Sequence, residues 1–277
     1  MNQNERETEY TGLIRKIRRR RKWVIALTLI AVFAVIAFGF PAQLEIMGET
    51  ILDSKGWHPA LIILLILLIL FVEFIVYAAV SIPAAIALDQ ECDPEKHLVL
   101  NTALTKPNQL DPLLAADYLY LGKYPEALMY AERMAASKNE TTSLSGLFCK
   151  ARCEFLLGND ESFRQTSEEF RERLSGNAKR KPKTQATLLK MEQVLELLRA
   201  ISDNDTEKIK DLRTSIQCWD KSKATEGFVH YLKGLAAYKT GDRKQAIYRF
   251  MTVTENYPKI IFAKYSEEYL SGIEIPT

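Results

Sequence analysis

The chain has 277 residues, of which 47% are hydrophobic and 26% are charged, and its formal net charge is +2. A nucleic-acid-binding protein needs a strongly basic face, so this near-balance of basic and acidic residues argues against one. The charges are unevenly placed, because almost none of them falls between Trp23 and Leu88. The two parts of the chain are therefore suited to different surroundings.

Two runs near the N-terminus are almost free of charge. The first covers residues 23–40, and the second covers residues 60–80, where only Glu73 is ionisable. A helix of about 20 apolar residues crosses ~30 Å of hydrocarbon. The sequence therefore predicts a hairpin of two transmembrane helices within residues 23–88, with a short extracytoplasmic loop between them.

Basic residues before the first run predict the orientation of this hairpin. Residues 1–22 form a basic segment with seven Lys or Arg between Arg15 and Lys22, whereas the connection 41–59 contains a single lysine. Because positive charge stays on the cytoplasmic side, both termini are expected in the cytoplasm. The alternative is a cleaved signal peptide, whose apolar region is usually only ~7 to 15 residues long.

Glu73 is the ionisable residue of the second run. A carboxylate in mid-membrane costs roughly 2.5 to 3.5 kcal/mol, so it usually faces a partner or is protonated. Thr28 of the first run is expected at a similar depth, and a hydrogen bond from protonated Glu73 to Thr28 would join the two helices. Contact of Glu73 with another membrane subunit, or a proton or ion pathway, are the alternatives.

Residues 89–277 carry repeated signals for pairs of helices. Four turns, at Gly122, Gly158, Asp203 and Gly241, follow one another at intervals of 36, 45 and 38 residues. The helix pairs expected around them are 111–121 with 124–136, 144–157 with 160–174, 184–201 with 205–216, and 228–240 with 242–256. A period of about 34 to 47 residues is typical of helical solenoids. The predicted fold is all-α, with the transmembrane hairpin followed by a cytosolic α-solenoid of about four pairs.

Several of these pairs resemble the tetratricopeptide repeat, which has small residues where its helices cross, a glycine turn, an aromatic residue and a closing proline. The last pair carries the pattern best, with Gly234, Tyr238, Gly241, Asp242, Ala246, Phe250 and Pro258. The first pair matches in part, with Ala115, Tyr118, Gly122, Tyr124 and Ala127. The second keeps Ala151 and Gly158 but has Phe163 where alanine is expected, and the third departs from the pattern.

The resemblance implies a concave groove lined by the first helix of each pair. The candidate partner-binding residues in that groove are Tyr120, Phe148, Arg152, Phe155, Tyr231, Tyr238 and Lys239. Aromatic and arginine side chains are frequent anchors in protein interfaces. The alternative for each residue is that it packs against the next helix.

The expected function is that of a membrane-anchored scaffold or adaptor, which binds a protein or peptide partner at the cytoplasmic face of the membrane. A general similarity to short bacterial anchored repeat proteins indicates a multi-pass protein of the bacterial plasma membrane. The alternative function is an accessory subunit of a membrane transporter or secretion complex, packed against it through the transmembrane helices.

Motifs for chemistry are missing from the sequence. The four cysteines, Cys92, Cys149, Cys153 and Cys218, include no CxxC pair and have no histidine at zinc-ligand spacing, so they are expected to be free thiols. Neither a nucleophile elbow, a phosphate-binding glycine loop, a metalloprotease motif nor a dinucleotide fingerprint is found. We therefore expect a protein that is not an enzyme, with no catalytic residue, metal or cofactor.

Overall fold

The computed structural model describes residues 3–39, 45–46, 49–50, 58–105, 110–176 and 180–272. The chain divides into two compact units, Met1–Pro83 and Ala84–Thr277. Helices dominate the described residues, which confirms the expected all-helical class. Two short strands were not expected: β1 (Glu45–Ile46) and β2 (Glu49–Thr50) pair antiparallel, with Glu45 opposite Thr50.

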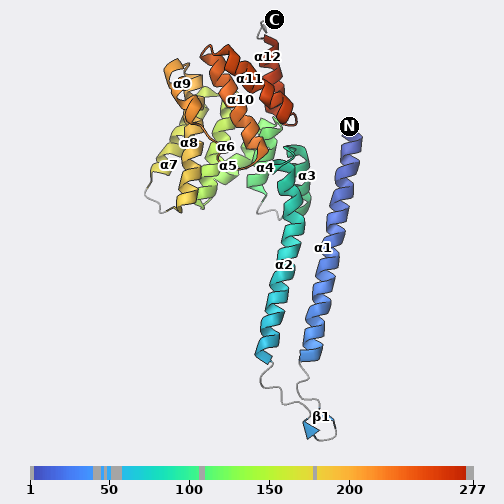
Figure 1. The fold of residues 1–277 in the computed structure, drawn as a ribbon. Coiled ribbons are helices and arrows are strands. Elements are labelled where there is room, and N and C mark those ends of the chain that lie inside the picture. The colour runs from blue at the N-terminus through green and yellow to red at the C-terminus, as the bar shows by residue number, and fades with distance from the viewer. Residues whose placement is uncertain are drawn as a thin grey trace. The chain divides into compact units, whose positions relative to one another are not determined.

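The first unit is built on two long helices. Helix α1 covers Gln3–Gly39, and helix α2 covers His58–Asp89 and continues into the second unit. The two helices run side by side, and the connection between them contains β1 (Figure 1).

In the part of the chain that the structure describes, no helix has an apolar stretch long enough to cross a membrane. This finding contradicts the predicted transmembrane helices at 23–40 and 60–80 and the predicted multi-pass plasma-membrane location. In α1 the helix ends at Gly39, so its uncharged part beginning at Trp23 is 17 residues, about 26 Å long. In α2, Glu73 leaves uncharged stretches of 15 residues on each side, 58–72 and 74–88.

The second unit is an array of helices that follow one another along the chain (Figure 1). Its helices are α3 (Pro94–Leu104), α4 (Asp111–Tyr120), α5 (Tyr124–Ala135), α6 (Glu140–Leu156), α7 (Asp160–Ser175), α8 (Pro182–Ser202), α9 (Thr206–Ser215), α10 (Lys223–Lys239), α11 (Arg243–Asn256) and α12 (Ile261–Gly272). From α3 onward each helix contacts the next one, and α4, α6, α8, α10 and α12 also contact one another in that order. The even-numbered helices therefore stack in one row, and each odd-numbered helix from α5 to α11 packs between two of them.

Four turns inside the helix pairs share one backbone geometry. Gly122, Gly158 and Gly241 have φ near +74°, and Asn204 takes the same left-handed region with φ 54°. After each of them, the next backbone N–H donates to the carbonyl five residues earlier, as in Lys123 N to Tyr118 O at 2.8 Å. This is the helix-ending motif for which glycine and asparagine are preferred, because other residues are strained at positive φ.

The array also curls so that its first helices contact its last ones. The Tyr120 ring of α4 lies edge-on to Phe262 of α12, with centroids 6.4 Å apart. The Tyr124 hydroxyl of α5 is 2.8 Å from that of Tyr265 in α12. Just before α3, Asp93 accepts a 2.7 Å hydrogen bond from Lys259. The row of even-numbered helices thus encloses an interior that its own side chains fill.

Candidate functional site

The predicted groove residues lie mostly inside the curled array. Tyr120, Phe148, Arg152 and Tyr231 are all buried, with at most 5% of their surface exposed. Phe155 is half-buried and contacts Phe163, at 5.5 Å between ring centroids. Since these side chains contact the chain itself, a partner can reach the buried four only if the array opens.

Two of the predicted groove residues remain at the surface. Tyr238 is 45% exposed and lies beside Tyr269 of α12, with ring centroids 5.2 Å apart. Lys239 is exposed and donates a 3.1 Å hydrogen bond to the side chain of Asn204. Both lie at the C-terminal end of α10, where the third and fourth helix pairs meet.

The interior is organised around Arg152, which is 4% exposed. Its guanidinium carbon lies 4.3, 5.0 and 5.4 Å from the ring centroids of Phe148, Trp219 and Phe228. Its Nε and Nη1 atoms have no hydrogen-bond partner, although cation–π contacts with three rings offset part of the cost of burying the charge. Arg152 therefore packs into the core by its flat face, which is an uncommon position for a charged group.

Next to Arg152, a chain of hydroxyl groups connects α4 to the start of α10. Tyr120 Oη lies 2.9 Å from Thr225 Oγ1, and Thr225 donates to Asp220 Oδ2 at 2.9 Å. Ser222 donates to the other Asp220 oxygen at 2.9 Å, and it also accepts from the Thr225 backbone as the N-cap of α10. Burial raises the pKa of Tyr120 to about 12. These groups provide one another's hydrogen-bond donors and acceptors, and they hold the α9–α10 connection against α4.

The cysteines near this centre behave as core residues. Cys149 and Cys153 are buried one turn apart on α6, and all four cysteines are free thiols, as predicted. The hydrogen bond with Cys149, reinforced by burial, raises the pKa of Cys153. Among the residues that the structure describes, no group of His, Cys, Asp and Glu is arranged to hold a metal ion.

A second buried polar group joins α3 to α4. His97 Nδ1 lies 2.6 Å from Asp117 Oδ1, and Asn101 lies 3.0 Å from the other ring nitrogen. Asp117 is fully buried, and burial raises its pKa to about 6 even though the hydrogen bond from His97 acts in the opposite direction. The pair is a structural contact between the two helices, since neither side chain is open to a substrate.

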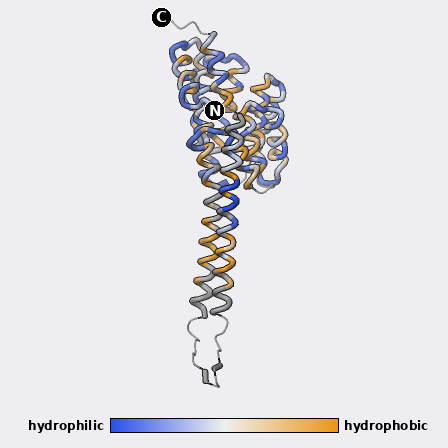
Figure 2. The backbone as a smooth tube through the Cα atoms, turned by 90° about the vertical axis from the view of Figure 1, so that its right-hand side faces the viewer, coloured by the Kyte–Doolittle hydropathy of each residue, from blue (hydrophilic) through white to orange (hydrophobic). Residues whose placement is uncertain are grey.

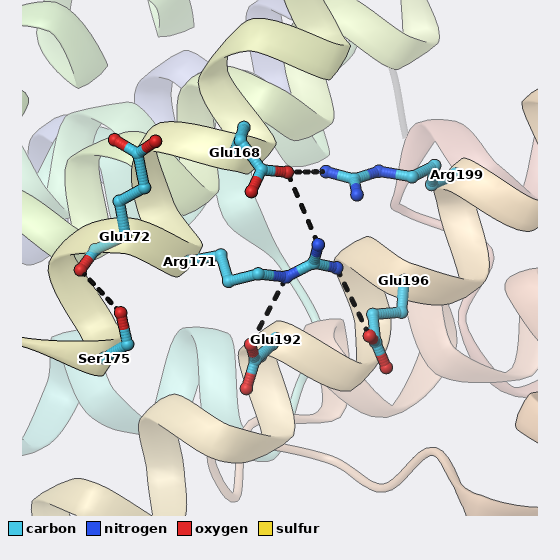
Figure 3. A network of polar contacts seen from close by, with 7 residues as sticks. All are labelled: Glu168, Arg171, Glu172, Ser175, Glu192, Glu196 and Arg199. Carbon is cyan, nitrogen blue, oxygen red and sulfur yellow. Dashed lines mark hydrogen bonds and ion pairs between the residues drawn. The ribbon is translucent and has the colours of Figure 1, made fainter.

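On the outer side of the array, charged residues link α7 to α8 (Figure 3). Arg171 lies 3.4 Å from Glu168, 3.8 Å from Glu192 and 3.3 Å from Glu196. Arg199 lies 3.2 Å from the same Glu168 oxygen that Arg171 approaches. Because each charge has an opposite charge beside it, this network stabilises the contact between the second and third helix pairs and offers little to a charged ligand.

The first unit, in contrast, exposes large apolar side chains. On α1 these include Leu29 and Ile30, both 64% exposed, and Phe33, which is 73% exposed. On α2 the exposed apolar residues are Leu64, Leu67, Leu70, Phe71, Phe74, Ile75 and Ile82. Figure 2 shows the hydrophobic colouring of both long helices, which continues over several turns. Contiguous exposed apolar surface is a common feature of sites that interact with other proteins or with membranes.

The basic segment continues the exposed face of α1 toward the N-terminus. Arg15, Arg18, Arg19 and Lys22 are exposed, and with Thr11 and Ile14 they line a shallow hollow of about 470 Å³. In a helix with 3.6 residues per turn, these basic residues lie on the same side as Leu29 and Phe33. We call this face of α1, Arg15 to Phe33, the α1 stripe. The helical spacing of these residues in the sequence is sufficient to predict this shared face, in addition to the orientation that their charge predicts.

The two predicted intramembrane polar residues are placed only in part. Thr28 lies in α1 and is half-buried. Glu73 lies within α2, but its side chain falls outside the described residues. The predicted hydrogen bond between the two therefore stays a prediction.

No family model, curated protein or solved structure matches this chain.

Proposed function

We propose that this chain is an adaptor, a binding protein without catalytic activity, which docks on a helical partner through the exposed apolar faces of α1 and α2. The observation that carries the proposal is the exposure of Leu29, Ile30 and Phe33 on one side of α1. A phenylalanine left 73% exposed loses the free energy that burial would contribute, about 1.5 to 3 kcal/mol for a full side chain. A partner that covers this face recovers that free energy on binding.

A helix is the partner shape that fits these faces best. Exposed apolar residues on α2 recur at Leu64, Leu67, Leu70 or Phe71 and Phe74, a spacing of three to four residues. Such a row presents ridges and grooves along the helix axis, into which the side chains of another helix pack. Helix-on-helix docking is also a recurrent mode of protein recognition, read as anchors at i, i+3, i+4 and i+7.

In this proposal the array of the second unit, similar to tetratricopeptide repeats, is a rigid platform. The filled interior supports rigidity, because Arg152, Phe148 and Trp219 are buried in contact with one another inside the array. The turn motif repeated four times supports the resemblance at the level of helix pairs. The platform would present its outer helices to further partners.

A second candidate function is peptide binding by the array itself, at the end of α10. It is favoured by Tyr238 and Lys239, the groove residues that remain exposed, and by the exposed side chains of Tyr248 and Met251 on α11, the next helix. An exposed tyrosine beside a lysine is a suitable anchor for a partner side chain. In this case the first unit would have no part in binding.

Site-specific photocrosslinking in cells that express the full chain tests both candidates. A photoreactive phenylalanine analogue replaces Phe33 or Phe71 in two variants, and Tyr238 or Tyr248 in two others. We expect discrete crosslinks to another protein from the first two variants. Crosslinks only from Tyr238 and Tyr248 would replace the proposal by peptide binding on the array, and an absence of protein crosslinks at all four positions would refute both.

A further inference from the structure

We propose that the partner helix carries an acidic cluster beyond its apolar face, and that the basic half of the α1 stripe binds this cluster. The inference rests on the proposed docking function and specifies the chemistry of the partner. Its basis is the order of residues along the stripe, where Arg15, Arg19 and Lys22 are followed by Leu29 and Phe33 on one side of the helix. A ligand that covers the whole stripe must therefore be anionic at one end and apolar at the other.

The basic half of the stripe lacks acidic neighbours on its own helix. Residues three and four positions away in a helix lie side by side, and such pairs of opposite charge stabilise it. Besides one another, Arg15, Arg19 and Lys22 have no acidic residue at these positions. The residues there are Thr11, Gly12, Lys16, Arg18, Trp23, Ile25 and Ala26. The like charges therefore repel one another within α1, and carboxylates supplied from outside would remove that repulsion.

The shallow hollow between the basic side chains gives the acidic cluster a place. Arg15, Arg19 and Lys22 line it together with Thr11, Ile14 and Arg18. Thr11 and Arg18 already have interactions within the chain, so the other three basic residues are the ones proposed to bind carboxylates. Arginine binds carboxylate through two parallel N–H···O bonds, which favours a carboxylate over a weakly bound solvent anion. Two turns of a partner helix with Asp or Glu on one face offer several such groups at matching spacing.

The distance between the two halves of the stripe sets the spacing within the partner. The centre of Arg15 to Lys22 lies about 12 residues from the centre of Leu29 to Phe33, which corresponds to about 18 Å at 1.5 Å per residue. In a helix packed alongside α1, the acidic cluster should therefore lie about 12 residues from the centre of the apolar face. A sequence with this spacing can be recognised without a structure.

An anionic lipid surface also combines negative charge with an apolar phase, but the stripe does not suit it. A helix lying on a lipid surface keeps its charges on the face opposite the apolar residues. Here Arg19 and Leu29 share one face and follow each other along the axis, so a helix lying flat would carry its charges into the apolar layer.

The test measures binding of the full chain to two synthetic helical peptides. Both have a two-turn leucine face, and a cluster 12 residues away consists of four glutamates in one peptide and four lysines in the other. We expect the glutamate peptide to bind about tenfold more tightly, because several charge pairs of modest strength act together. The triple variant Arg15→Glu, Arg19→Glu and Lys22→Glu should reverse this preference. Lys244→Glu, at an exposed position on α11 of the second unit, should leave it unchanged.

The outcomes separate this inference from the proposed function. If both peptides bind equally well and Leu29→Ser with Phe33→Ser abolishes binding of both, docking stands and the acidic cluster is refuted. If neither peptide binds and the Phe33 variant gives no crosslink, the proposed function fails as well. If vesicles of phosphatidylglycerol capture the chain and displace the glutamate peptide, a lipid surface replaces the protein partner. Circular dichroism of each variant excludes unfolding, and Arg15→Lys with Arg19→Lys should retain the preference.

Discussion

Tyr120 and Thr225 are 105 residues apart in the chain, yet their hydroxyl oxygens lie 2.9 Å apart in the interior of the array. The contact connects the first helix pair to the last one. It belongs to a set of contacts, including Tyr124 with Tyr265 and Asp93 with Lys259, that turn a linear series of helix pairs into a curled array. In a series without these contacts, each pair is stabilised by its neighbours alone.

Substitution Tyr120→Phe should therefore lower the free energy of unfolding by about 1 kcal/mol, the net contribution of one buried hydrogen bond. Thr225 keeps its bond to Asp220, so its own hydroxyl proton stays paired and the loss stays moderate. Urea unfolding followed by circular dichroism measures the change. Tyr248→Phe on the exposed face of α11 is the matched control and should be neutral. Equal stability of both variants would show that the hydroxyl contact contributes nothing to closure.

Gly146 tests how closely α5 and α6 approach. A Cβ atom added at this position would lie 2.7 Å from Met134 Cβ and 2.8 Å from the Ala131 carbonyl oxygen. Because one of these neighbours is backbone, the helices must separate to accept a methyl group, and Gly146→Ala should destabilise the fold by about 1 to 3 kcal/mol. Gly272→Ala, where nothing lies within 4 Å, is the control and should be neutral or stabilising. Thermal unfolding compares the two variants, and an unchanged midpoint for Gly146→Ala would contradict the close packing.

Local signals were sufficient for the helix pairs. The sequence predicts turns at Gly122, Gly158 and Gly241, because a helix end favours a residue with positive φ, and the structure confirms all three. At the weaker third turn, Asn204 takes the left-handed conformation in place of glycine, directly after the predicted turn residue Asp203. A local backbone requirement leaves a local trace in the sequence.

The contacts that fill the interior have no comparable signal in the local sequence. Phe148 of α6 contacts Trp219 of the α9–α10 connection, with ring centroids 4.8 Å apart, although the two residues are 71 positions apart in the chain. Repeat spacing predicts neighbours one pair away, but it does not give the curvature that brings α6 to the α9–α10 connection. For this reason repeat spacing predicts Phe148 and Arg152 in an open groove, while the structure has both residues in the core.

In the first unit, a local property of the sequence predicts transmembrane helices that the structure contradicts. Summed hydropathy predicts transmembrane helices at residues 23–40 and 60–80. In the structure α1 ends at Gly39, and Glu73 divides the apolar residues of α2 into two shorter stretches. Helical periodicity in Arg15, Arg19, Leu29 and Phe33 was available in the same residues. It indicates one face with two kinds of chemistry, which summed hydropathy cannot show.

Arg152 should be replaceable by an apolar residue of similar size. Its charge is buried among three aromatic rings, and two of its nitrogens lack hydrogen-bond partners, so desolvation of the guanidinium opposes folding. Arg152→Met keeps most of the volume and removes the buried charge, and we expect it to be neutral or to stabilise by about 1 kcal/mol. Arg152→Ala leaves a cavity beside Phe148 and Trp219 and should cost about 2 to 4 kcal/mol. Chemical denaturation measures the free energy of unfolding of both variants. A methionine variant as unstable as the alanine variant would show that the charge itself is required for stability.

Cys218 should be the most reactive thiol of the folded chain. It is the half-exposed cysteine, whereas Cys92, Cys149 and Cys153 are buried. Burial raises the pKa of Cys218 above its ordinary value, so its reaction with a disulfide reagent should be slow at pH 7 and faster at pH 9. Cys218→Ser should remove the first phase of the reaction, while Cys149→Ser should leave it intact. A first phase that survives Cys218→Ser would mean that one of the buried thiols becomes accessible.

The His97–Asp117 pair predicts how stability depends on pH. Burial raises the pKa of Asp117 from 3.8 to about 6, so its protonated form is favoured by folding. The contribution of this group to stability is therefore fully present below about pH 3.8 and is lost as the pH rises through 6, up to about 3 kcal/mol in total. Asp117→Asn removes this titration while keeping a polar side chain beside His97. As the pH is raised from 4.5 to 7.5, the free energy of unfolding of the wild-type chain, measured by urea titration, should fall relative to that of the variant. A difference between the two chains that stays constant over this range would show that Asp117 titrates normally in the folded state.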